Sequence, residues 1–174
     1  MDEVDIAIVG GGIAGMSAAY FLAQRLPQTT VGVFEAEATL THHTTGRSAA
    51  VYIENYGALS LRPLTVASRS FFWDPPPELV DGPLMSRKGL LTVARPDRVA
   101  AAQEGAATGK AINPEIELID AEAAVELAAM LRPELIGAAV YEPGAAGIDV
   151  AGLHQAFVRG FRASGGRIFA TRRI

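Results

Sequence analysis

The stretch 4-VDIAIVGGGIAGMSAAYFLAQRL-26, followed by 31-VGVFE-35, decides the fold of this chain. Residues 4–9 form a short apolar, β-branched run that ends in glycines, which predicts a buried parallel strand. Residues 13–26 carry apolar side chains spaced for one broad helix face, and Pro27 follows them. Residues 31–35 predict a second strand. The sequence therefore predicts a βαβ unit, whose crossover is expected to be right-handed.

The glycines between the first strand and the helix form a GxGxxG pattern made by Gly10, Gly12 and Gly15. Gly10 allows a tight turn, Gly12 lets the backbone approach a pyrophosphate, and Gly15 lets the helix pack closely on the sheet. The first backbone N–H groups of the helix, including those of Ile13 and Ala14, lie at the positive end of the helix dipole. The pattern thus predicts a phosphate-binding loop.

Glu35, at the end of the second strand and next to Ala36, follows the last glycine at the spacing of a ribose-binding acid, about 20 residues. Its carboxylate can accept hydrogen bonds from both ribose hydroxyls, and it would repel a 2′-phosphate, which disfavours NADP. The simpler alternative is a tight strand-to-helix turn followed by a surface glutamate. The unit predicts binding of an ADP moiety and leaves the choice between NAD and FAD open.

Periodicity gives a coarse map of the remaining chain. Residues 36–50 are expected to form a loop, and Asp120 and Asp149 are expected to cap helices. The other expected helices span residues 60–73, 97–108, 121–130 and 150–163, and the other expected strands span 89–94, 138–142 and 167–174.

Composition excludes several classes of function. The 174 residues carry a net charge of −4, which argues against a nucleic-acid-binding surface. The absence of cysteine excludes disulfides, Cys-ligated metals and thiol catalysis. No apolar run is long enough to span a membrane. The acidic start differs from a secretory signal, so a cytoplasmic location is expected.

The segment 42-HHTTGRSAA-50 resembles the flavin loop of the D-amino acid oxidase/glycine oxidase superfamily of FAD enzymes. It is most similar to D-arginine dehydrogenase-type D-amino acid dehydrogenases, in which a T-G-R-S-A-A string follows the ribose acid. The similarity covers essentially the whole chain. It continues at residues 56–57, 67–72, 83–86, 131–133, 137–138, 141–143 and 147–149.

The resemblance implies that FAD is the cofactor and that residues of this loop hold it. The implied loop contacts are Thr44, Thr45, Gly46, Arg47, Ser48, Ala49, Ala50 and Val51. Ile174 aligns with the position whose backbone meets the adenine. His42 and His43 are expected to be solvated, and no metal site is expected. Without the resemblance, an ordinary polar loop would be the better interpretation.

The resemblance also implies oxidation of an amine or D-amino acid by hydride transfer to flavin N5, with hydrolysis of the imine to a 2-oxo acid. Tyr56 aligns with a tyrosine of the substrate pocket, although a core or surface tyrosine fits its position equally well. Val51 and Gly89 stand where the D-arginine-oxidising type has a histidine and an acidic residue. These departures disfavour a cationic substrate side chain. The electron acceptor stays open.

The resemblance implies an α/β fold: a Rossmann-like FAD-binding βαβ unit with an inserted α+β substrate-side layer, truncated after its first half. Residues 1–50 would form the βαβ unit and flavin loop, 51–147 the insertion, and 148–174 the return to the FAD-binding sheet. Such an amino-terminal fragment, lacking the strand expected beside 4–9, is expected to be inactive alone. Two alternatives are a 2-hydroxy acid oxidoreductase and a non-catalytic nucleotide-binding remnant.

Overall fold

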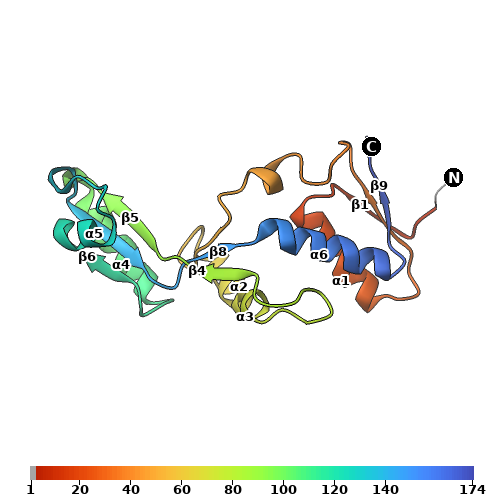
Figure 1. Cartoon of the computed structure of the whole chain (residues 1–174), viewed down its shortest axis with the longest axis horizontal. Coiled ribbons are helices and arrows are strands. Elements are labelled where there is room, and N and C mark those ends of the chain that lie inside the picture. The colour runs from red at the N-terminus through yellow and green to blue at the C-terminus, as the bar shows by residue number, and fades with distance from the viewer. Residues whose placement is uncertain (1–2) are drawn as a thin grey trace. The chain divides into compact units, whose positions relative to one another are not determined.

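The computed structural model of the chain describes residues 3–174 and has two compact units, each assembled from separate segments. Unit 1 comprises Met1–Ala50, Phe71–Leu84 and Asp149–Ile174, and unit 2 comprises Val51–Ser70 and Met85–Ile148. The chain therefore passes from one unit to the other after residues 50, 70, 84 and 148 (Figure 1). Residues 71–84, which lie within the expected insertion, group with unit 1.

Unit 1 contains the βαβ unit and confirms this part of the sequence prediction. Its parallel sheet has the strand order β1-β2-β9, with Ile8 opposite Val33 and Val33 opposite Ile168. Helices α1 and α6 lie side by side in this unit (Figure 1). Its elements are β1 (Ile6–Val9), α1 (Ile13–Arg25), β2 (Val31–Phe34), the 3-10 helix η1 (Thr44–Arg47), α6 (Val150–Ala163) and β9 (Arg167–Phe169).

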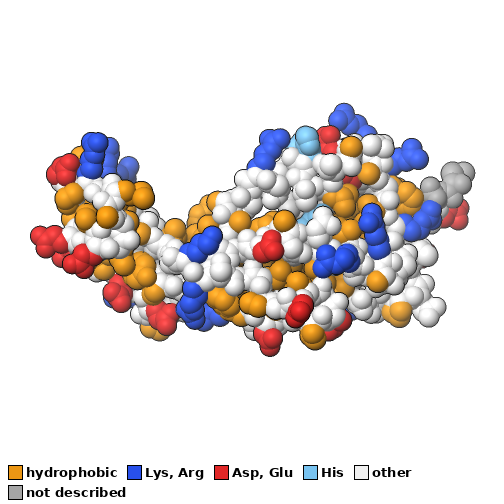
Figure 2. All heavy atoms as spheres, in the orientation of Figure 1, with side chains coloured by type: hydrophobic (Ala, Val, Ile, Leu, Met, Phe, Trp, Pro, Cys, Tyr) orange, Lys and Arg blue, Asp and Glu red, His pale blue; other side chains and the backbone are white. Residues whose placement is uncertain are grey.

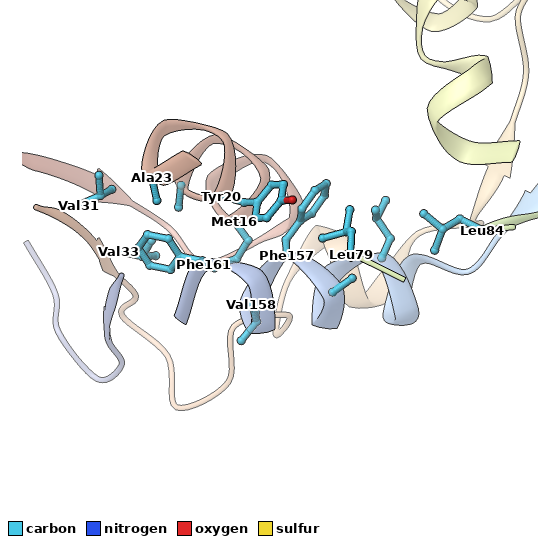
Figure 3. Packing of buried hydrophobic residues seen from close by; sticks show 13 residues of the cluster. Met16, Tyr20, Ala23, Val31, Val33, Leu79, Leu84, Phe157, Val158 and Phe161 are labelled. Atoms are coloured by element: carbon cyan, nitrogen blue, oxygen red, sulfur yellow. The ribbon is translucent and has the colours of Figure 1, made fainter. Parts of the chain in front are cut away.

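The core of unit 1 forms where the apolar faces of α1 and α6 meet (Figure 3). Met16 from α1 and Phe161 from α6 are fully buried, and the Tyr20 and Phe157 ring centroids lie 5.5 Å apart. Leu79 joins this core from the 71–84 segment. Burial of each large apolar side chain contributes about 1.5–3 kcal/mol, so this cluster fixes the two helices that border the glycine loop.

Unit 2 is antiparallel. One sheet has the order β3-β8-β4 and the other has the order β5-β7-β6. Helix α4 packs on β7 and buries Ala102 and Ala106 against Ile116 and Val140. The elements are β3 (Val51–Tyr52), α2 (Arg62–Ala67), α3 (Arg69–Trp73, which runs on into unit 1), β4 (Met85–Arg87), β5 (Leu90–Ala94), η2 (Pro96–Arg98), α4 (Val99–Lys110), β6 (Glu117–Ile119), α5 (Ala121–Leu127), η3 (Pro133–Leu135), β7 (Ala138–Glu142) and β8 (Ala146–Ile148).

Four details of the sequence prediction were wrong. The strand expected over 167–174 ends at Phe169. The helix expected over 60–73 is divided into α2 and α3 at Ser68, whose hydroxyl donates to the Leu64 carbonyl and so competes with the helix backbone. Helix α5 stops at Leu127 because Ala128 leaves helical geometry. The loop expected over 36–50 contains η1. The short strands β3, β4, β6 and β8 were not predicted, since two or three residues show no period-2 pattern.

Charged side chains of both signs are interspersed on the face drawn in Figure 2, within each unit. This distribution agrees with a chain whose net charge is only −4. Within residues 3–174, no helix combines the length and the apolar character needed to cross a membrane.

Candidate cofactor site

Two glycines of the loop occupy positions that favour glycine, Gly10 because of its backbone conformation and Gly15 because of lack of space. Gly10 follows β1 with a φ of +97°, a conformation that favours glycine, and its N–H donates to the Phe34 carbonyl oxygen at 2.8 Å. A Cβ on Gly15 would overlap the Gly10 carbonyl oxygen. The close packing of α1 on the strand end, which the sequence pattern predicts, therefore depends on both residues.

The amino-terminal end of α1 has the properties of an anion site. Its N-cap residue Gly12 supplies no side-chain cap, and its first turn contains no acidic residue to offset the positive end of the dipole. The Ile13 N–H donates to the Thr45 hydroxyl oxygen at 3.0 Å, which ties the loop containing η1 to the helix start. Ala14 lies exposed in the same turn. Backbone N–H groups at such a terminus are suited to a pyrophosphate.

Glu35 is joined to the glycine loop through backbone hydrogen bonds. One carboxylate oxygen accepts from the Glu37 N–H at 2.9 Å, and the other accepts from the Gly11 N–H at 2.8 Å. These bonds, first that of Glu37 and then that of Gly11, lower the pKa of Glu35, and the Ala36 backbone adds to the effect. The carboxylate is therefore ionised at neutral pH and keeps part of its acceptor capacity for a ligand.

The loop expected to hold the cofactor is shaped by its backbone. A Cβ on Gly46 would overlap the Thr41 carbonyl oxygen, so only glycine fits there. The Ser48 hydroxyl oxygen accepts a hydrogen bond from the Ala50 N–H at 3.0 Å. Ala50 has a φ of +54°, which costs an alanine about 1 kcal/mol and is typical of functional segments. Thr44, Arg47 and Ala49 are exposed along this loop.

A pocket of about 320 Å³ lies between this loop and the start of α6. Asp149 contributes to its wall, and its carboxylate caps α6 by accepting from the Gly152 N–H at 2.8 Å. The described residues include no group of three or more His, Cys, Asp or Glu side chains arranged for a metal ion. The pocket is lined by Thr41, Thr45, Gly46, Ser48, Ala50, Asp149, Val150 and Ala151.

The carboxyl-terminal segment runs beside Glu35. The Arg172 N–H donates to the Glu35 carbonyl oxygen at 2.8 Å, and the Thr171 N–H donates to the Glu37 carbonyl oxygen at 3.1 Å. Ile174, expected to meet the adenine, follows on this segment and is exposed. The structure thus brings the glycine loop, Glu35, Thr45 and the carboxyl-terminal segment together in unit 1.

The substrate-side candidate Tyr56 lies in unit 2, as do Gly89 and Val51, the second of which was also expected to contact the flavin. Val51 is exposed in β3, and Tyr56 is 76% exposed in the segment that follows. Gly89 has a φ of +68°, and a Cβ there would lie 3.1 Å from the Tyr141 ring. Local backbone geometry therefore disfavours an acidic side chain at position 89. The substrate-side role of Tyr56 stays a prediction.

Gly11 within the glycine loop and His154 beside it were not recognised from the sequence. Gly11 is buried between the flanking glycines, and His154 of α6 is 1% exposed with its Nε2 2.8 Å from the Gly11 carbonyl oxygen. A signal existed for His154. It lies four residues after Val150 and three before Phe157, on the apolar face of the predicted helix.

This geometry defines a dinucleotide-binding protein, and comparisons with known proteins specify its class. Residues 5–174 match the family described as FAD dependent oxidoreductase, so the chain belongs to this family and FAD is its cofactor. Similar solved structures include glycine oxidase from Geobacillus kaustophilus, at a TM-score of 0.83 and 22% identity over 97% of this chain and 46% of that chain. Another is the FAD-bound L-α-glycerophosphate oxidase from Mycoplasma pneumoniae, at a TM-score of 0.81 and 20% identity over 98% and 45%.

A curated relative matches over a short stretch only. The mitochondrial L-2-hydroxyglutarate dehydrogenase of Homo sapiens is 47% identical over 47 residues, which cover 27% of this chain and 10% of the relative. The chain spans less than half the length of the two solved structures above. These likenesses establish the α/β FAD-binding fold, and the reaction of the whole protein is a matter for proposal.

Proposed function

We propose that this chain forms the cofactor-holding part of an oxidoreductase that oxidises an amine or a D-amino acid. The substrate would lose a hydride from its Cα–H and a proton from its nitrogen, and hydrolysis of the resulting imine would yield ammonia and a carbonyl compound, which is a 2-oxo acid when the substrate is a D-amino acid. Bound FAD supplies the hydride acceptor at its N5 atom. The observation that carries the proposal is the start of α1, where the N-cap Gly12 supplies no side-chain cap and the first turn has no acidic residue, beside an ionised Glu35.

The proposed cofactor contacts follow the geometry of unit 1. Backbone N–H groups around Gly12 would receive the pyrophosphate, and Glu35 would accept hydrogen bonds from the ribose hydroxyls. The loop from Thr44 to Ala50 would meet the ribityl and flavin parts, and Ile174 would meet the adenine. Since the chain aligns with about half of each solved neighbour, we expect the 174 residues alone to be inactive.

The first test is a visible absorption spectrum of the chain after mixing with FAD and desalting. We expect a flavin band that weakens in Glu35→Gln, because an amide accepts ribose hydrogen bonds less well than a carboxylate. The matched control is Glu126→Gln, an exposed glutamate on α5 in unit 2, which should retain the same band. Equal retention by both variants would contradict the role of Glu35.

The second test concerns the substrate side chain, in the complete enzyme that contains this chain. Val51 and Gly89 remove polar groups from positions where the D-arginine-oxidising type carries them. We therefore expect D-leucine to be oxidised at least as fast as D-arginine. Much faster turnover of D-arginine would refute the proposed preference for an uncharged side chain.

A 2-hydroxy acid is the second candidate substrate. It is favoured by the 47-residue match to L-2-hydroxyglutarate dehydrogenase, although that match covers only 10% of that relative. The discriminating measurement compares a 2-hydroxy acid with the D-amino acid of the same carbon skeleton in the complete enzyme. Release of ammonia supports the amine reaction, and turnover of the hydroxy acid alone supports the alternative.

A further inference from the structure

The Gly11–Gly12 peptide is held from inside the fold by His154. The ring Nε2 of His154 lies 2.8 Å from the Gly11 carbonyl oxygen. A carbonyl oxygen can only accept, so Nε2 carries the hydrogen and donates it. This contact joins the middle of the glycine loop to α6, which lies 143 residues further along the chain.

The direction of this hydrogen bond fixes the direction of the neighbouring amide. The described residues include no cis peptide, so the Gly11 C=O and the Gly12 N–H belong to one planar trans unit and point in opposite directions. Because His154 draws the carbonyl toward α6, the Gly12 N–H faces away from α6. Glu35 fixes the preceding peptide through the Gly11 N–H at 2.8 Å.

Glycine makes such a constraint necessary. Residues on both sides of this peptide lack a Cβ, so the peptide can rotate at little steric cost. If it turned over, the carbonyl oxygen would face an incoming anion at the start of α1 and would repel it. A donor behind the loop prevents this by holding the carbonyl in place.

Packing alone does not explain a histidine at this position. His154 is 1% exposed, and within the described chain its Nδ1 has no hydrogen-bond partner. An unpaired buried polar atom costs about 1–3 kcal/mol, a penalty that an apolar side chain of similar size avoids. The bond from Nε2 to the loop is the polar contact that compensates for this cost.

We propose that His154 is a positioning residue that orients the Gly11–Gly12 peptide so that the Gly12 N–H faces the cofactor pyrophosphate. This inference rests on the proposed cofactor site. Two variants separate orientation from packing. His154→Gln places an amide donor near the position of Nε2, whereas His154→Met fills the volume without a donor.

The affinity test measures the FAD dissociation constant of the three proteins by quenching of flavin fluorescence. We expect His154→Met to raise the constant about tenfold and His154→Gln to stay within about threefold of the original, since one hydrogen bond of about 1–1.5 kcal/mol is at stake. The melting temperatures of the three proteins without FAD should not rank in the same order as their FAD affinities. Equal affinity of both variants, or an affinity loss that parallels the loss of melting temperature, would overturn the proposal.

A second readout is independent of FAD. In the ¹⁵N-labelled, FAD-free chain, the His154 ring should show the Nε2–H tautomer, and the Gly12 amide resonance should shift in His154→Met but not in His154→Gln. An Nδ1–H tautomer, or an unchanged Gly12 resonance in the Met variant, refutes the positioning role. If no form of the chain retains FAD, the proposed cofactor site fails for this chain, and the tautomer and amide results still decide the role of His154.

Discussion

Each unit contains a glutamate that accepts several hydrogen bonds, but the partners of the two glutamates differ. In unit 1, Glu35 accepts hydrogen bonds from backbone N–H groups at the rim of a parallel sheet. In unit 2, Glu54 is 5% exposed and receives hydrogen bonds from the side chains of Tyr52, Arg69 and Asn113.

The difference concerns remaining acceptor capacity. A carboxylate offers about four acceptor positions, and those of Glu54 are filled by two bonds from Arg69, one from Tyr52 and one from Asn113. The phenol of Tyr52 stays a donor, because burial and the bond to Glu54 raise its pKa to about 12. Glu54 is therefore a structural group, whereas Glu35 keeps capacity for a ligand.

The largest expected effect comes from closing the glycine contact in unit 1. Gly15→Ala would force the loop and α1 apart, because the new Cβ overlaps the Gly10 carbonyl oxygen. We expect the free energy of unfolding to fall by about 3 kcal/mol, and we expect the variant to lose FAD on desalting. Gly105→Ala in α4 of unit 2 is the matched control. Its Cβ meets nothing within 4 Å, so helix propensity should raise stability by about 0.5–1 kcal/mol. Chemical unfolding of both variants checks this contrast.

The next effect breaks the buried ion pair of unit 2. Arg69→Met leaves Glu54 without its bidentate partner, and we expect the free energy of unfolding to fall by about 2 kcal/mol. This effect is smaller than that of breaking a fully buried ion pair, because the Arg69 side chain is 47% exposed. Arg95→Met removes the exposed Arg95–Asp97 pair and should cost less than about 0.5 kcal/mol. Similar unfolding midpoints for the two variants would show that the Glu54 network stabilises the fold no more than the exposed Arg95–Asp97 pair does.

A smaller effect depends on pH and involves Glu142 in unit 2. Burial raises the pKa of Glu142 in the folded state. The contribution of Glu142 to the stability of the fold is therefore present below the ordinary glutamate pKa and is lost as pH rises through the higher pKa of the folded state. Glu142→Gln removes this loss. We expect the variant to be more stable than the original at pH 7, with the gap closing toward about pH 4. Urea unfolding at both pH values measures the gap, and a variant less stable at pH 7 would contradict it.

The smallest effect has the opposite sign and belongs to Glu35 in unit 1. Hydrogen bonds lower the pKa of Glu35 in the folded state. The contribution of Glu35 to the stability of the fold is therefore present above the ordinary glutamate pKa and is lost as pH falls through the lower pKa of the folded state. Glu35→Gln should be less stable at pH 7, and the difference should shrink below about pH 4. Solvent screening keeps the effect small, and the same urea series detects it. A difference that widens in acid would exclude this assignment.

How far the sequence predicts the structure depends on the range of the interactions. The βαβ unit was predictable because strand, glycines and helix follow each other directly, and the caps Asp120 and Asp149 were predictable for the same reason. The Glu54 network was not, since Asn113 reaches Glu54 across 59 positions of chain. Gly12 and Glu35 can be recognised from their spacing in the sequence, because both belong to a pattern of glycines followed by an acidic residue. The contact of His154 with Gly11 depends on the tertiary packing of α6 and has no such pattern.

The passage of the chain between the units has a consequence for its synthesis. Helix α1 emerges from the ribosome early, yet its packing partner α6 follows only after all of unit 2 has been made. Unit 2 draws most of its chain from one continuous segment, Met85–Ile148, and can gather its contacts while translation proceeds. Part of the apolar face of α1 therefore stays uncovered until α6 has been synthesised, so the nascent chain exposes more apolar surface in the half that holds the glycine loop.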